Sequence, residues 1–131
     1  MAEEKEMKPE AENAIEEIKD IVEKCVECGM CKSLCPVFRT LHEEVTSPRG
    51  KAIMLKEEIY DKIVYDCTLC KGCEQKCPVG IKLCDAFRKA RVILTEKGKG
   101  TKENKEMIEN IKEFGNPFGK EAGKSGKLYC C

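Results

Sequence analysis

Four cysteines lie in the stretch Cys67-Thr68-Leu69-Cys70-Lys71-Gly72-Cys73-Glu74-Gln75-Lys76-Cys77-Pro78. Their spacing, C-x2-C-x2-C-x3-C followed by proline, is typical of the thiolates that hold cubane iron–sulfur clusters. The same spacing and the same trailing proline occur earlier in the chain, at Cys25, Cys28, Cys31, Cys35 and Pro36. Eight thiolates in two matching runs are enough for two 4Fe–4S clusters, and the rest of the chain is interpreted as a helical frame around them.

Other roles for clustered cysteines fit the sequence less well. A structural zinc site pairs two C-x2-C elements into one tetrahedral set, which leaves the third cysteine of each run unexplained, so zinc is the alternative metal. A cysteine nucleophile is disfavoured because His42 is the only histidine, and a lone histidine is more often a surface residue than a base. Residues 1–24 are acidic and lack the apolar centre of a signal peptide, which predicts a cytoplasmic, reducing location rather than a disulfide scaffold.

The composition predicts a small apolar core. The 131 residues are 41% hydrophobic, 5% aromatic and 37% charged. A chain of this kind needs an internal link between its parts, which bound metal clusters provide. The longest apolar run, 52–55, is too short to span a membrane.

Zero formal net charge conceals an uneven distribution of charge along the chain. Residues 1–24 carry nine acids and four lysines, whereas residues 97–131 carry eight lysines and five acids. The lysines after residue 97 alternate with Glu and Gly rather than with aromatic residues. That pattern is typical of a solvated surface and predicts no nucleic-acid binding.

Apolar residues at helical spacing predict four helices, over 11–24, 48–60, 82–97 and 102–114. The residues expected to point inward include Ala11, Ile15, Ile18 and Val22 in the first helix, Ala52, Leu55 and Ile59 in the second, and Leu83, Phe87, Ala90 and Leu94 in the third. The second helix begins at Ser47-Pro48, a capping residue followed by proline at the first helical position. Gly98 and Gly115 follow the last residues of the third and fourth helices, where glycine commonly ends a helix. A shorter helix or turn is expected over 60–65. No alternating apolar run is long enough for a sheet, so the predicted fold class is all-α.

The predicted domain organisation has three parts. Residues 1–10 show no period and are expected to be disordered. Residues 11–118 form the two-cluster domain, and residues 119–131 form a flexible tail or the start of a truncated cysteine-rich domain. Within the two ligand runs a loop rather than a helix is expected, so that three cysteines converge on one cubane. Gly29 and Gly72 are expected to allow positive φ there, and Pro36 and Pro78 to bend the chain away.

The layout of the whole chain resembles the α-helical ferredoxins, because 31 residues with a helix of their own separate Cys35 from Cys67. Within that group it is similar to the iron–sulfur C subunit of heterodisulfide reductase. It also resembles the N-terminal cluster domains of the iron–sulfur subunits of glycolate oxidase and anaerobic glycerol-3-phosphate dehydrogenase. The resemblance covers about residues 15–118. Its motifs are Cys-Pro-Val-Phe at 35–38, Ser-Pro-Arg-Gly-Lys at 47–51, Cys-Pro-Val-Gly-Ile at 77–81 and Gly-Asn-Pro-Phe-Gly at 115–119.

The resemblance implies a set of ligands for each cluster. In two-cluster ferredoxins the fourth cysteine of each run binds the cluster of the other run. Carried over to this chain, the pattern assigns one cluster to Cys25, Cys28, Cys31 and Cys77. It assigns the other to Cys67, Cys70, Cys73 and Cys35. Neither run could then complete its cluster alone, and both clusters would lie close together.

The resemblance also implies a function. The chain would relay single electrons between a flavin or hydrogenase partner and a cysteine-rich catalytic subunit of an oxidoreductase complex such as heterodisulfide reductase, with no catalytic site of its own. The alternatives are a free ferredoxin-like carrier, an N-terminal fragment of a larger glycolate, lactate or glycerol-3-phosphate dehydrogenase subunit, and purely structural clusters. Three cysteines stay outside both ligand sets: Cys84 is expected to be a small buried hydrophobe, and Cys130 and Cys131 free thiols.

Overall fold

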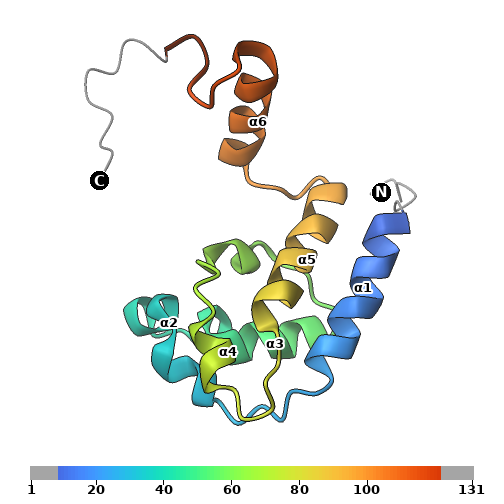
Figure 1. The fold of residues 1–131 in the computed structure, drawn as a ribbon, viewed down its shortest axis with the longest axis vertical. Helices are drawn as coiled ribbons and strands as arrows, with labels where there is room; N and C mark the ends of the chain where they lie inside the picture. The colour runs from blue at the N-terminus through green and yellow to red at the C-terminus, as the bar shows by residue number, and fades with distance from the viewer. Residues whose placement is uncertain (1–8, 122–131) are drawn as a thin grey trace. The chain divides into compact units, whose positions relative to one another are not determined.

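Helices α1 (Pro9–Val22) and α5 (Leu83–Glu96) lie side by side in the computed structural model, which describes residues 9–121 (Figure 1). Together they supply most of the buried apolar residues. Each helix buries one apolar stripe, as its period predicts. The stripe on α1 consists of Ala11, Ala14, Ile18 and Val22. The stripe on α5 includes Leu83, Phe87, Ala90 and Leu94, the four residues that the sequence predicts, together with Cys84, Ala86 and Ile93.

Six short elements connect α1 to α5, and several of them are 3-10 helices, marked η. In chain order they are η1 (Met30–Leu34), α2 (Pro36–Leu41), η2 (Glu44–Thr46), α3 (Pro48–Lys56), η3 (Lys62–Asp66) and α4 (Gly72–Lys76). No strand is present between residues 9 and 121, so the predicted all-α fold class is confirmed. None of the helices in this range has the length and apolar character that crossing a bilayer requires.

Helix α3 begins as the sequence predicts but ends earlier. The Ser47 hydroxyl accepts a hydrogen bond from the Gly50 amide at 2.9 Å, and Pro48 occupies the first helical position. The helix ends at Lys56 rather than at residue 60. Ile59, expected to point inward, is 51% exposed, because the chain leaves the helix through Glu58 in a left-handed conformation. The N-terminus of α3 is therefore fixed by a capping hydrogen bond, whereas its C-terminus ends earlier than predicted.

Gly50 allows the first turn of α3 to lie directly on η2. A Cβ atom at Gly50 would lie 2.0 Å from the carbonyl oxygen of Glu44, which is far inside van der Waals contact. Any side chain there would separate the two elements. This close approach fixes the position of Lys51, the next residue, which points into the interior.

Residue contacts divide the chain into one unit up to Lys99 and a second from Gly100. The second unit contains α6 (Lys102–Phe114) and η4 (Gly119–Glu121). Helix α6 has the predicted bounds and ends at Gly115, whose φ is +71°. The division of the chain at residues 10 and 118 stays a prediction. The expected disorder of 1–10 is wrong for residues 9 and 10, which begin α1, and residues 119–121 of the expected flexible tail form η4. Residues 1–8 and 122–131 lie outside the described residues.

Candidate iron–sulfur site

The first ligand run begins three residues after the end of α1. The Cys25 amide donates to the Val22 carbonyl at 2.9 Å, so the run is tied to the last turn of the helix. Gly29 has a φ of +78°, which confirms its predicted left-handed conformation. The prediction of a loop throughout both runs is wrong for Cys31, which lies in the 3-10 helix η1, and for Cys73, which lies in α4. A tight helical turn brings cysteines three residues apart to the same side of the backbone.

The second run repeats the backbone conformation of the first. Glu27 and Leu69, each two residues after the first cysteine of its run, have φ values of 56° and 55°. Two residues further on, Gly29 and Lys71 both have positive φ, at 78° and 60°. The expectation that Gly72 would supply the positive φ of this run is therefore wrong.

Gly72 instead allows two segments to approach closely. A Cβ atom there would meet the Cβ and carbonyl oxygen of Leu34, each at 3.4 Å. Leu34 ends η1 and Gly72 begins α4, and these two elements of the two runs pack against each other. The two ligand runs therefore face each other across a short distance.

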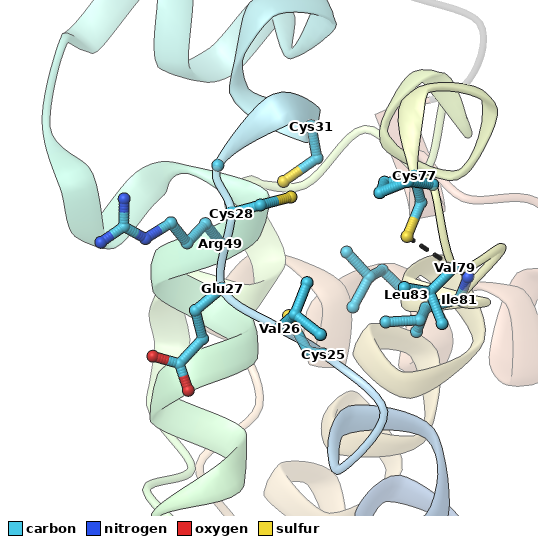
Figure 2. A pocket seen from close by; sticks show the side chains of 12 residues that line it. Cys25, Val26, Glu27, Cys28, Cys31, Arg49, Cys77, Val79, Ile81 and Leu83 are labelled. Carbon is cyan, nitrogen blue, oxygen red and sulfur yellow. Dashed lines mark hydrogen bonds between the residues drawn. The ribbon is translucent and has the colours of Figure 1, made fainter.

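The packing of the two runs brings the last cysteine of the second run to the first three cysteines of the first. One pocket is lined by Cys25, Cys28, Cys31 and Cys77, and its volume, with the adjoining open solvent included, is about 360 Å³. Figure 2 shows the sulfur atoms of Cys28, Cys31 and Cys77 turned toward the space between the first run and residues 77–81. Burial, reinforced by the neighbouring charge of Cys25, raises the pKa of the Cys31 thiol to about 11. Four thiols thus share a partly desolvated space.

The other four cysteines, Cys35, Cys67, Cys70 and Cys73, do not line this pocket. Cys35 and Cys67 both act electrostatically on the ammonium of Lys51, and Cys67 acts on Cys73. Cys73 is buried at the start of α4, whereas Cys70 is exposed. Burial raises the pKa of Cys73, and the thiol of Cys84 lies within hydrogen-bonding reach of it.

Two residues outside the ligand sets lie where the sequence predicts. Cys84 is only 1% exposed, in agreement with its prediction as a buried residue. His42, at the end of α2, is exposed. Cys130 and Cys131 lie outside the described residues.

The donor chemistry of the pocket suits an iron–sulfur cluster. Thiolates are the soft ligands that iron–sulfur clusters prefer, and four of them surround one space at the edge of the apolar core. Among residues 9–121 no three His, Cys, Asp or Glu side chains are grouped closely enough to hold a single metal ion. A cubane needs no such grouping, because each thiolate binds a different iron atom.

Comparison with known protein families gives the same chemistry. The family described as the 4Fe-4S dicluster domain matches residues 21–81, a segment that contains both cysteine runs. The match also includes α3 and η3, which lie between the two runs.

Curated relatives include the two protein types that the motifs resemble. The glycolate oxidase iron-sulfur subunit of Escherichia coli K12 is 27% identical over 105 residues, which cover 74% of this chain and 26% of that protein. The iron-sulfur C subunit of the CoB–CoM heterodisulfide reductase of Methanopyrus kandleri is 34% identical over 84 residues, 59% of this chain and 41% of that protein. The C subunit of the H(2):CoB-CoM heterodisulfide,ferredoxin reductase of Methanothermobacter thermautotrophicus is 36% identical over 74 residues, with corresponding shares of 55% and 40%. The chain spans between about a quarter and two fifths of these relatives.

Backbone amides of the two cysteine runs and of the residues that follow them point at three of the cysteine sulfurs. The amide of Phe38 donates to Cys35 Sγ at 3.5 Å, where Cys35 caps the start of α2. Pro36 therefore begins a helix that the sequence analysis did not predict. Cys67 Sγ accepts from the Leu69 amide at 3.4 Å, and Cys77 Sγ from the Ile81 amide at 3.5 Å. Hydrogen bonds to ligand sulfurs are among the features that tune the reduction potential of an iron–sulfur cluster.

Arg91 of α5 holds the segment that leads into the second run, and the sequence analysis did not identify it. Its guanidinium donates to the Val64 carbonyl from Nε at 3.1 Å and from Nη2 at 2.9 Å, and also to the Cys67 carbonyl. The guanidinium lies 5.5 Å from the centre of the Tyr65 ring. Arg91 stands four residues after Phe87, at the border of the apolar stripe of α5, and this position is the signal in the sequence that could have indicated its role.

Proposed function

We propose that this chain carries two 4Fe–4S clusters and relays single electrons within an oxidoreductase complex. The observation that carries the proposal is the pocket lined by Cys25, Cys28, Cys31 and Cys77. It joins three cysteines of one run to the last cysteine of the other, which is the arrangement that two-cluster ferredoxins use.

The ligand sets follow from that arrangement. The first cluster takes Cys25, Cys28, Cys31 and Cys77, and the second takes Cys67, Cys70, Cys73 and Cys35. Support for the second set is the proximity of Cys35 and Cys67 to the same lysine and the packing of η1 against α4. Each cluster, when bound, supplies a one-electron carrier between an oxidised and a reduced state.

The backbone amides and the apolar residues around the cysteines tune the reduction potential of the clusters and limit their exposure to water. Amides of Phe38, Leu69 and Ile81 point at sulfur and stabilise its negative charge. Cys25, Cys31, Cys67 and Cys77 rest against the apolar core, which limits the access of water. All eight proposed ligand positions are occupied by cysteine, so no coordination site is left for a substrate. The chain itself therefore moves electrons and does not transform a substrate.

The partners that we propose are a flavin-containing or hydrogenase electron donor and a cysteine-rich catalytic subunit, in a complex of the heterodisulfide reductase or glycolate oxidase type. The support is the names of the relatives, which are subunits of such oxidoreductases. Native extract purified without oxygen should yield the chain together with large partners. Recovery of the chain alone would favour a free carrier instead.

Metal analysis of the anaerobically purified chain tests the clusters directly. The proposal requires about eight iron atoms and eight labile sulfides per chain, with a visible absorption that bleaches as air destroys the clusters. Reduction by dithionite should give electron paramagnetic resonance signals of two clusters. One zinc or about four iron atoms per chain would contradict the proposal, and clusters that do not reduce reversibly would indicate a structural role.

A further inference from the structure

Lys51 is the largest fully buried side chain of the described residues, with 1% of its surface exposed. Lysine is almost never buried to this extent without a partner, because removing an ammonium group from water is costly. Its ammonium donates a hydrogen bond to the carbonyl of Thr46, which is itself 2% exposed. One neutral carbonyl compensates only part of the lost hydration, so the site calls for a nearby negative charge.

The negative charge comes from the second set of cysteines. Helix α3, which carries Lys51, packs against η1, and η1 ends one residue before Cys35. The element η2, which supplies the Thr46 carbonyl, packs against η3, and η3 ends one residue before Cys67. The start of α3 therefore lies between the two segments that deliver these cysteines.

The electrostatics of Lys51 agree with this placement. Burial lowers the pKa of Lys51, and the strongest opposing effects come from the negative charges of Cys67, Cys35 and Asp66, in that order. Arg91 acts in the same direction as burial. The two largest favourable partners of the buried ammonium are thus two proposed ligands of one cluster.

The first set of cysteines has a different cation beside it. Arg49 lines the pocket of Cys25, Cys28, Cys31 and Cys77, but its side chain is 37% exposed and its Nε lies 3.6 Å from a carboxylate oxygen of Glu44. Glu27 also lines this pocket, but its carboxylate points away from the cysteines and pairs with Lys56 at 2.9 Å (Figure 2). Water and a neighbouring acid weaken the field of Arg49 at the first set, whereas the field of a buried lysine is screened much less.

We propose that Lys51 raises the reduction potential of the cluster held by Cys67, Cys70, Cys73 and Cys35 above that of the other cluster. The inference rests on the proposed function. Gaining an electron adds one negative charge to the cluster and its thiolates, and a buried ammonium beside two of those thiolates stabilises the added charge. The second cluster is then the one that holds the electron at equilibrium, and the first cluster accepts or donates electrons at a lower potential.

The test is a redox titration of the cluster-loaded full chain, followed by electron paramagnetic resonance. Lys51→Met and Lys51→Gln both remove the charge, and Gln can still donate to the Thr46 carbonyl. In both variants the higher of the two midpoint potentials should fall. At a fixed potential, the ratio of reduced to oxidised cluster should then be at least tenfold lower than in the wild type. A tenfold change corresponds to about 59 mV for a one-electron couple. The lower midpoint should stay in place, and Lys51→Arg should restore the higher one.

Lys89→Met is the matched control. It removes the same charge from α5, where Lys89 pairs with Glu17 of α1, and it should leave both midpoints unchanged. Cys70→Ser, which alters one ligand of the second cluster, identifies the spectrum that belongs to that cluster. A shift of the other cluster by Lys51→Met would overturn the assignment.

Two outcomes separate this inference from the proposed function. Variants that hold two reducible clusters with unchanged midpoints would limit Lys51 to a structural role. A wild-type chain without two reducible clusters would overturn the proposed function itself. If the variants do not load clusters, a salt titration of the wild type provides the test. A difference between the two midpoint potentials that is set by a buried charge should persist from low salt to about 1 M. Midpoint potentials that merge as salt is added would assign the difference to surface charge instead.

Discussion

Replacing Arg91 with methionine should release the segment that leads into the second cysteine run. Methionine keeps most of the apolar stem that packs against α5, so the change removes mainly the guanidinium. The Val64 carbonyl loses both donors, at 3.1 and 2.9 Å, and the Cys67 carbonyl loses its bond to Nη2. The Tyr65 ring also loses the cation that lies 5.5 Å from its centre.

The expected cost follows from these contacts. A hydrogen bond from a charged group contributes about 1.5–3 kcal/mol, and a buried acceptor left without a donor costs about as much. Val64 is 2% exposed, so its carbonyl has little access to replacement water. Arg91 itself is half-buried, which reduces the total. We expect the free energy of unfolding to fall by about 3 kcal/mol, a large part of the roughly 5–15 kcal/mol typical of a small domain.

Arg88→Met on the same helix is the control for this change. Its side chain is 62% exposed and forms an ion pair with Asp85 at 3.8 Å, so the variant should stay within about 0.5 kcal/mol of wild type. Anaerobic urea unfolding, followed by circular dichroism, compares the two variants at equal iron content. Amide exchange should also speed up over 62–67 in Arg91→Met and stay unchanged in α1. Equal urea midpoints for both variants, or unchanged exchange over 62–67, would refute the structural role of Arg91.

Three further changes test the site and its frame. Cys77→Ala should remove about half of the iron by disrupting the cluster of the opposite run, whereas Cys84→Ala should leave iron content unchanged; metal analysis of both variants checks this. Gly50→Ala should lower the free energy of unfolding by about 1–3 kcal/mol, measured by urea unfolding, because its Cβ would overlap the Glu44 carbonyl; wild-type stability would show that η2 moves freely. Removing the clusters with a chelator should speed amide exchange over 25–36 and 67–78 more than in α1 and α5, and uniform exchange would contradict this.

Local sequence patterns were enough to predict the metal chemistry and most of the helical frame. Ligand spacing and helical period repeat every three or four residues, so they can be read without knowledge of tertiary contacts. That is why the stripes of α1 and α5, the cap at Ser47 and the left-handed conformation of Gly29 agree with the structure. The prediction was wrong where one residue type has two structural uses. A glycine can adopt positive φ or allow two segments to approach closely, and Gly72 does the second.

Tertiary packing, in contrast, determines which cysteines meet and which charges surround them. The meeting of Cys77 with Cys31 depends on the packing of α4 against η1, two segments far apart in the chain. Lys51 stands in a polar motif, and only the close approach of α3 and η2 makes it buried. Arg91 likewise gains its role from carbonyls 24 to 27 residues away. Burial and electrostatic environment are sums over neighbours brought together by folding, and a sequence pattern records only the neighbours along the chain.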